Sequence, residues 1–253
     1  MWLLVAVFGP ALAGDPLAMD SAVRLQGPSA AHWLGTDQFG RDVAARVVAG
    51  ARYALIGVAL TTAVAGVAGS ALGLVAGLAG GKVDGLLARA IDLWLALPGV
   101  LFAMAIAGVV GPSFENAMLA IGFMRIPSFG RVARASAIGV RGAAYIEAAR
   151  ALGVSEGRLL WRHALPNVLG PLLALAGARA STALLAGSAL SFVGIGAPVP
   201  EPEWGALVAG GRPYLYEAWW ISVAPCAAIV SLALGFQLLG DTLGDVQRER
   251  GRD

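Results

Sequence analysis

Long apolar runs, separated by short polar segments, dominate the chain. Four of them carry at most one charged residue, and each is long enough to cross the hydrocarbon layer, which takes about 20 helical residues. They are Tyr53–Gly81 and Ala218–Gly240 without charge, Ile91–Gly111 with only Asp92, and Leu165–Ile195 with only Arg179. This pattern predicts an all-α membrane protein.

A fifth, weaker run covers about Phe114–Gly130, where Arg125 and Pro127 interrupt it. It must also be a span if the helices on either side are to be joined with consistent orientation. Arg125 then either faces the bundle interior or a watery cavity, or extends its guanidinium to the lipid headgroups. Of these two alternatives, we favour the second.

The segment Trp2–Ala13 is apolar but too short for a complete span. No basic residue precedes it, although Ala11-Leu12-Ala13 resembles a signal-peptidase site. We therefore favour the outer part of a first transmembrane helix, whose start is truncated or misassigned, over a signal peptide. With this segment included, we expect about six transmembrane helices.

The distribution of arginines predicts the orientation. Loops rich in Lys and Arg stay in the cytoplasm, and six arginines face only Glu147 and Glu156 in the segment that precedes Leu165. The six are Arg131, Arg134, Arg141, Arg150, Arg158 and Arg162. The C-terminus, with three further arginines, is then cytoplasmic too, and residues 15–52 and 198–217 lie outside, with Trp204, Trp219 and Trp220 as an interfacial aromatic belt.

We accordingly divide the chain into three parts. Residues 1–52 form a partial first helix and an external loop, and residues 53–240 form the transmembrane domain, including a cytoplasmic loop at 135–166. Residues 241–253 form a cytoplasmic tail.

The composition of the chain also indicates a membrane protein. Hydrophobic residues make up 58% of the 253 positions, charged residues 13%, and the mean hydropathy is +0.73. A soluble globule of this size needs more polar surface. The net charge of +2 does not indicate a nucleic-acid surface, and the single Cys226 excludes a disulfide within the chain.

Three glycines are spaced for a close helix contact. Gly69, Gly73 and Gly77 form two overlapping GxxxG steps on one face of the first clear span. A chain this rich in alanine and glycine also yields such spacing by chance, so the sequence leaves both explanations open.

The cytoplasmic loop predicts two short helices. Tyr145, Ala148, Ala149 and Leu152 share one helical stripe, which predicts an amphipathic helix that Gly153 ends. A second short helix follows, capped by Ser155, and Leu165-Pro166 begins the next span. Glu147 and Arg150, three residues apart, can pair with each other or with a partner's charges. Such an element can enter a groove on a cytoplasmic partner and transmit its movement.

These residues resemble the EAA loop of binding-protein-dependent ABC import permeases. Glu147-Ala148-Ala149, Gly153 and Leu165-Pro166 fit the spacing EAA-x3-G-x9-I-x-LP, with His163 at the isoleucine position. The resemblance extends over nearly the whole chain and is closest to the C-type subunit of dipeptide, oligopeptide and nickel permeases. It is carried by residues 32–42, Gly80-Gly81 with Val83-Asp84, Asp92, Leu97-Pro98, Arg131, Arg134, residues 162–167, Leu190-Ser191-Phe192, Trp204-Gly205 and residues 238–241. Gly187, Ile126 and Gln237 depart from it, and Arg125 and Arg179 are unusual.

The resemblance implies a MetI-like fold of type I ABC importers and a set of partners. These are two ATP-binding-cassette ATPase subunits, a homologous second permease and an external substrate-binding protein. ATPase coupling would fall to Tyr145, Glu147, Ala148, Ala149, Arg150, Gly153, Leu165 and Pro166. Residues 162–167 favour peptides over nickel or another small solute as the substrate. No residue is assigned to the substrate pathway.

The sequence contains no motif that indicates an enzyme. The chain has no GxxxxGK[ST] phosphate loop, so ATP hydrolysis would occur elsewhere. His32 and His163 fall on opposite sides of the membrane, and Ser188 and Ser191 have no base nearby, so we expect no catalytic site, metal or cofactor. An ion-driven secondary transporter is the stronger alternative to an ABC permease. Such a transporter needs carboxylates at mid-membrane, but the only acidic residue of this sequence inside a clear span is Asp92, which Arg89 can neutralise.

Overall fold

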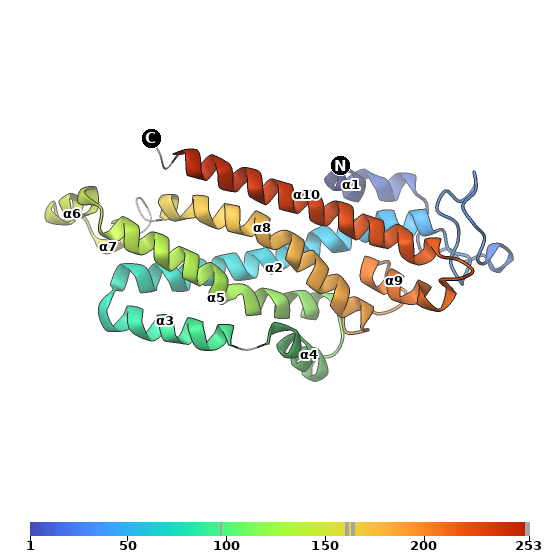
Figure 1. The fold of residues 1–253 in the computed structure, drawn as a ribbon, viewed down its shortest axis with the longest axis horizontal. Coiled ribbons are helices and arrows are strands. Elements are labelled where there is room, and N and C mark those ends of the chain that lie inside the picture. The colour runs from blue at the N-terminus through green and yellow to red at the C-terminus, as the bar shows by residue number, and fades with distance from the viewer. Residues whose placement is uncertain (97, 160–161, 163–164, 251–253) are drawn as a thin grey trace. The chain divides into compact units, whose positions relative to one another are not determined.

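The computed structural model describes residues 1–253 except 97, 160–161, 163–164 and 251–253. The described chain is helical, with no named strand (Figure 1). The helices are α1 (Trp2–Leu12), α2 (Val43–Ala79), α3 (Gly81–Leu95), α4 (Gly99–Val110), α5 (Phe114–Arg141), α6 (Ala144–Ala151), α7 (Glu156–Leu159), α8 (Leu165–Phe192), α9 (Trp204–Gly211) and α10 (Trp220–Arg250). Within the described residues, 3₁₀ turns cover Ser21–Val23 and Arg212–Tyr214.

Three of these helices are long and apolar enough to cross a membrane, judged by length and composition over the described residues. They are α2, α8 and the Trp220–Val246 part of α10. α1 and the Leu101–Val110 part of α4 are apolar but shorter. The prediction of an all-α membrane protein is thus confirmed, whereas the number of about six spans stays a prediction.

The prediction of one helix over Ile91–Gly111 is wrong. α3 ends at Leu95 and α4 begins at Gly99, with Pro98 between them. Proline restricts the residue before it to extended conformations, and its ring nitrogen cannot donate to the helix ladder. Pro127, by contrast, lies inside α5, which runs on for eleven residues beyond the predicted end at Gly130.

By its internal contacts the chain divides into two compact units. The first consists of Met1–Leu60, Ala103–Leu119 and Ser181–Gly235, and the second of Thr61–Phe102, Ala120–Ala180 and Phe236–Asp253.

The first unit is organised around buried tryptophans. Trp204, at the start of α9, is 1% exposed and donates its indole N–H to the Val47 carbonyl at 2.8 Å. Trp220 is also buried and donates to the Thr36 carbonyl at 3.1 Å. The predicted aromatic belt is therefore wrong for these two residues, because each indole N–H finds its acceptor within the protein; Trp219 is exposed.

The second unit is organised around a close contact between α2 and α5. A Cβ at Gly69 would lie 2.5 Å from the Ile126 carbonyl oxygen, and one at Gly73 would lie 2.2 Å from the Gly130 carbonyl oxygen. At Gly77 it would lie 2.6 Å from the Ala137 Cβ. All three glycines thus face α5, and chance spacing is not the explanation. The apolar core beside this contact consists of Ala65, Leu74, Phe129, Ala133, Ala137, Val168 and Leu172.

Candidate functional site

The predicted coupling loop forms two short helices, α6 and α7, joined by a tight turn. Gly153 has a φ of +79°, in the left-handed region that residues with a Cβ enter only at a cost. The Val154 N–H donates to the Ala149 carbonyl at 3.1 Å, which is the six-residue bond of a Schellman C-cap with Gly153 at the left-handed position. The helix break predicted at Gly153 is confirmed.

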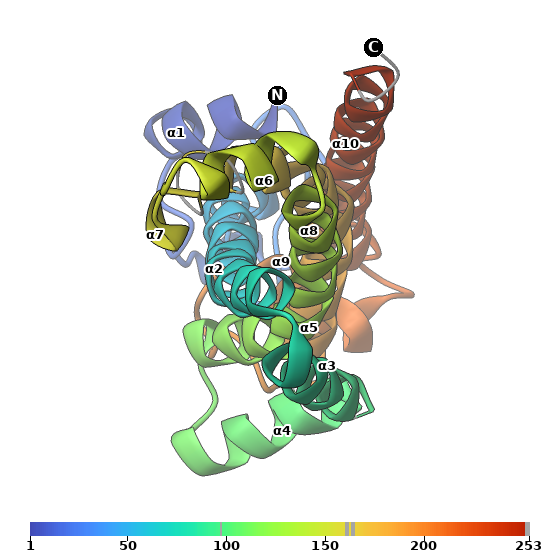
Figure 2. The same ribbon diagram turned by 90° about the vertical axis from the view of Figure 1, so that its left-hand side faces the viewer.

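The face that α6 buries differs from the predicted stripe. Ile146 in α6 and Leu159 in α7, both within the second unit, are each 2% exposed. Tyr145 is 48% exposed and Leu152 is 85% exposed. The stripe of Tyr145, Ala148, Ala149 and Leu152 therefore points largely away from this chain, with Ala148 exposed and Ala149 half-buried. Figure 2 shows α6 running crosswise to the long helices.

The remaining predicted coupling residues lie beside this face. Glu147 is exposed, and Arg150 belongs to α6, but its side chain, and with it the predicted pairing with Glu147, lies outside the described part. Leu165 and Pro166 are the first two residues of α8, where proline is tolerated because that N–H has no intrahelical acceptor. Leu165 packs against the core cluster of the second unit.

One hydrogen bond joins α6 to the start of α8. The Asn167 side-chain amide donates to the Tyr145 hydroxyl at 3.4 Å, a long bond. His163, at the isoleucine position of the motif, lies outside the described residues. In the predicted coupling element, Ile146 and Leu159 are thus buried and Tyr145 is bonded to α8, while Leu152 is exposed.

Two ion pairs attach α3 to α5 in the same unit. The Arg134 guanidinium donates to both carboxylate oxygens of Asp84, through Nη2 at 2.8 Å and through Nε. These bonds hold the pKa of Asp84 below its usual value. Arg131 Nη2 donates to Asp92 Oδ1 at 2.7 Å. The partner predicted for Asp92 was Arg89, one turn earlier, but the recorded ion pair is made across helices.

Arg125 is held within the second unit. Its Nη1 donates to the backbone carbonyl of Arg179 at 3.1 Å, and its side chain is half-buried. The favoured extension to the headgroups is therefore wrong, because the guanidinium is directed at the neighbouring helix α8. The alternative, a position facing the bundle interior or a cavity, agrees with this bond.

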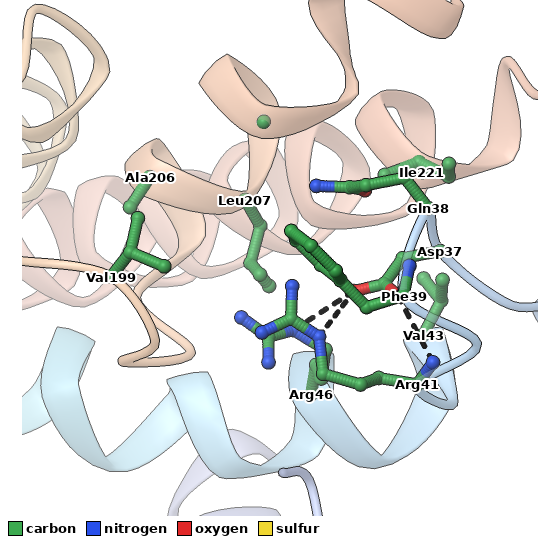
Figure 3. A pocket seen from close by; sticks show the side chains of 11 residues that line it. Asp37, Gln38, Phe39, Arg41, Val43, Arg46, Val199, Ala206, Leu207 and Ile221 are labelled. Carbon is green, nitrogen blue, oxygen red and sulfur yellow. Dashed lines mark hydrogen bonds and ion pairs between the residues drawn. The ribbon is translucent and has the colours of Figure 1, made fainter. Parts of the chain in front are cut away.

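A buried charge network lies in the first unit (Figure 3). Arg41 donates through Nε to Asp37 Oδ2 at 2.6 Å, and Arg46 Nε lies 3.9 Å from the same oxygen. Arg46 also donates to the backbone carbonyls of Pro16 and Pro200. A cavity of about 190 Å³ lies beside these groups.

All three charged side chains of this network are about 3% exposed. One carboxylate thus faces two guanidinium groups. Arg46, in α2, in turn joins this network to the segment before α9 through its bond to the Pro200 carbonyl. Sequence reasoning quoted Asp37 and Arg41 only as part of a family motif and missed Arg46.

The chain is similar to known transport proteins. Residues 69–250 match the family described as "binding-protein-dependent transport system inner membrane component". The chain is 43% identical, over 97% of its length and 83% of the relative's, to the probable D,D-dipeptide transport system permease protein DdpC of Escherichia coli K12. It is 42% identical to the dipeptide transport system permease protein DppC of Alkalihalophilus pseudofirmus, with 96% and 81% covered. It is 36% identical to the glutathione transport system permease protein GsiD of Pectobacterium atrosepticum, with 87% and 73% covered.

The fold has a counterpart among solved structures. It matches the MetNI methionine ABC transporter in an inward-facing conformation, with a TM-score of 0.64 and 17% identity, over 80% of this chain and 96% of that one. The helical fold, the apolar spans and the family match agree, and the chain belongs to the binding-protein-dependent ABC transport permeases, the integral inner-membrane components of these systems.

Proposed function

We propose that this chain is the C-type permease subunit of an ABC importer that carries dipeptides or oligopeptides across the cytoplasmic membrane. The observation that carries the coupling part of this proposal is the outward face of α6, where Leu152, the residue directly after the helix, is 85% exposed while Ile146 on the other face is buried. An apolar face of this kind suits insertion into a groove on a partner. The peptide substrate is supported by the names of relatives such as the DdpC and DppC permeases.

The proposed partners follow from family membership. Two ATP-binding-cassette ATPase subunits bind on the cytoplasmic side, a homologous second permease lies beside this chain in the bilayer, and an external binding protein delivers the substrate. The chain itself hydrolyses no ATP in this account. The C-terminus and the loop at 135–166 are cytoplasmic, and about six helices span the membrane, with the permease domain at 53–240.

The proposed mechanism is mechanical. ATP binding closes the ATPase pair, which moves the docked face formed by Tyr145, Ala148, Ala149 and Leu152. Gly153 sets the angle between α6 and α7, and Leu165-Pro166 passes the movement to α8, so that the membrane helices alternate between inward-open and outward-open states.

Uptake by the reconstituted complex tests this proposal. Proteoliposomes containing both permeases and the ATPase subunits, supplied with the binding protein, are expected to accumulate a labelled dipeptide only when ATP is present at the ATPase side. Accumulation should persist when an uncoupler removes the proton gradient. Uptake that stops with the uncoupler and continues without ATP would instead indicate the ion-driven transporter.

A second measurement addresses the substrate class. The ligand that co-purifies with the partner binding protein is expected to be a peptide. A nickel complex or another small solute in its place would support the alternative importer of the same family.

A further inference from the structure

The buried charge network of the first unit holds two guanidinium groups and one carboxylate. Asp37 Oδ2 accepts from Arg41 Nε at 2.6 Å, and Asp37 Oδ1 accepts from the backbone N–H groups of Phe39 and Arg41 at 2.8 and 3.0 Å. The carboxylate is thus engaged by Arg41 and by its own loop. Arg46 Nε lies 3.9 Å from Oδ2, which is too far for a hydrogen bond.

Arg46 is bonded, but to groups that carry no net charge. Its Nη1 and Nη2 donate to the backbone carbonyls of Pro16 and Pro200 at 3.1 and 3.2 Å. These bonds fix the guanidinium in place without neutralising it. Arginine stays protonated in proteins, so the network of Asp37, Arg41 and Arg46 carries one more positive charge than negative charge.

Six other carboxylates lie on the segments that line this site, residues 15–46 and 199–221, and within the described chain none of them forms an ion pair with either arginine. Two are used locally, since Asp42 bonds to His32 and Glu203 accepts from the Ala206 N–H at the start of α9. The other four are exposed or half-buried, where solvent screens their charge: Asp15, Asp20, Glu201 and Glu217.

A cavity of about 190 Å³ adjoins both arginines (Figure 3). It is far larger than the roughly 10–15 Å³ that a single water molecule needs. Its wall includes Gln38 and apolar side chains of α9 and α10, such as Leu207 and Ile221. Val199, which is 81% exposed, also lines it, so the cavity borders the surface of the chain.

The polar groups around this cavity are not fully satisfied by the protein. Gln38 Oε1, Arg41 Nη1 and Arg46 Nε are buried and have no hydrogen-bond partner among the described residues. Water can accept hydrogen bonds from guanidinium groups, but it does not neutralise a buried charge, and buried charges in proteins are paired. The site therefore combines an excess positive charge with room for a ligand beside it.

We propose that this cavity binds a small monovalent anion from solution, such as chloride or a short carboxylate. One negative charge balances the excess charge of the network, whereas a divalent anion would bring a second negative charge close to Asp37. Guanidinium N–H groups are strong donors to anions of either kind. Occupancy stabilises the first unit, because it pairs a charge that is shielded from water. The proposal does not depend on which substrate the transporter carries.

The test is thermal unfolding of the purified full-length chain in detergent, followed by tryptophan fluorescence, to which the buried Trp204 and Trp220 of the first unit contribute. Sodium lactobionate, whose disaccharide anion is much larger than acetate, is replaced stepwise by sodium chloride at constant ionic strength. A separate series uses sodium acetate and shows whether a carboxylate binds as well as a halide.

We expect the melting temperature of the wild type to rise in a saturable way, by about 2–4 °C once the anion is at several times its dissociation constant. Arg41→Gln should lose this rise, because one guanidinium then remains for one carboxylate. Gly210→Leu should lose it as well, because it adds apolar bulk at the cavity wall, where a Cβ would lie 3.8 Å from Gln38 Nε2. Arg52→Gln, at an exposed arginine of the same helix as Arg46, should keep it.

Each variant is compared with its own melting temperature in lactobionate, so a lower intrinsic stability does not imitate the loss. If one of the two cavity variants does not fold, the other decides. A wild type that responds to neither chloride nor acetate would overturn the site. A full response in Arg41→Gln or Gly210→Leu would overturn it too, because the anion would then act elsewhere on the chain.

Discussion

The Arg134 guanidinium of α5 donates hydrogen bonds to both carboxylate oxygens of Asp84, which lies in the first turn of α3. The two residues are fifty positions apart in sequence, and the ion pair joins α3 to α5 near the end of α5 that leads to the predicted coupling loop. The hydrogen bonds from Arg134 lower the pKa of Asp84, so its carboxylate stays ionised to a more acidic pH than that of a free aspartate.

We predict that Arg134→Ala and Asp84→Ala each lower the melting temperature of the purified protein, and that the double variant is no worse than the worse single one. The reason is that both changes remove the same paired hydrogen bonds. Additive losses in this double-mutant cycle would mean that the two side chains act independently.

The contact between α2 and α5 predicts a sharp contrast between two glycines of one helix. Gly73→Ala should destabilise the fold by about 1–3 kcal/mol, because its Cβ would lie 2.2 Å from the Gly130 carbonyl oxygen and overpacking forces the helices apart. Gly66→Ala is the matched control, since its Cβ would meet only Phe129 at 3.8 Å. The measurement is thermal unfolding in detergent, and equal stability of the two variants would contradict the contact.

The turn after α6 predicts a loss of coupling without a loss of insertion. In Gly153→Val, the valine must either adopt the φ of +79° at this position, which costs about 1–2 kcal/mol, or change the orientation of α6. Transport and ATPase binding should therefore fall while the amount of protein in the membrane stays unchanged. Gly157→Ala in α7 serves as the control, because its Cβ would meet nothing within 4 Å and its φ is not positive. Retained transport by Gly153→Val would count against the proposed coupling role.

The buried network of the first unit predicts a strong dependence on one carboxylate. Asp37→Asn leaves the guanidinium groups of Arg41 and Arg46 without the charge that both face, which is expected to cost about 3–5 kcal/mol. Glu217→Gln, at an exposed acidic position, should leave stability unchanged. Unfolding of the two variants by heat makes the comparison, and an Asp37→Asn protein as stable as the wild type would show that the network does not need this charge.

Local chemistry explains what the sequence predicted well. The turn at Gly153 and the proline at the start of α8 are decided by a few neighbouring residues, and the three-glycine face is a property of one helix. The break at Pro98 was also readable locally, but the length of the apolar run around it outweighed that signal in the prediction.

Long-range partners explain what the sequence did not reveal. The burial of Ile146 depends on which face of α6 packs within the fold, and Trp204 can be buried because a carbonyl of α2, 157 positions away, accepts its N–H. The partner of Asp92 is 39 positions away, whereas the predicted Arg89 was chosen for being one helical turn away. The pairing of Arg125 with the Arg179 carbonyl likewise depends on two helices meeting.

Site-specific photocrosslinking in membranes containing the assembled transporter tests the docking of α6 most directly. A photoreactive amino acid replaces Leu152, which is 85% exposed, and in separate samples Tyr216, which is fully exposed in the segment expected outside. Position 152 is predicted to form an adduct with an ATPase subunit, identified by mass spectrometry, and position 216 is predicted to form none. An assembled, ATP-hydrolysing complex in which position 152 never reaches an ATPase subunit would contradict the account.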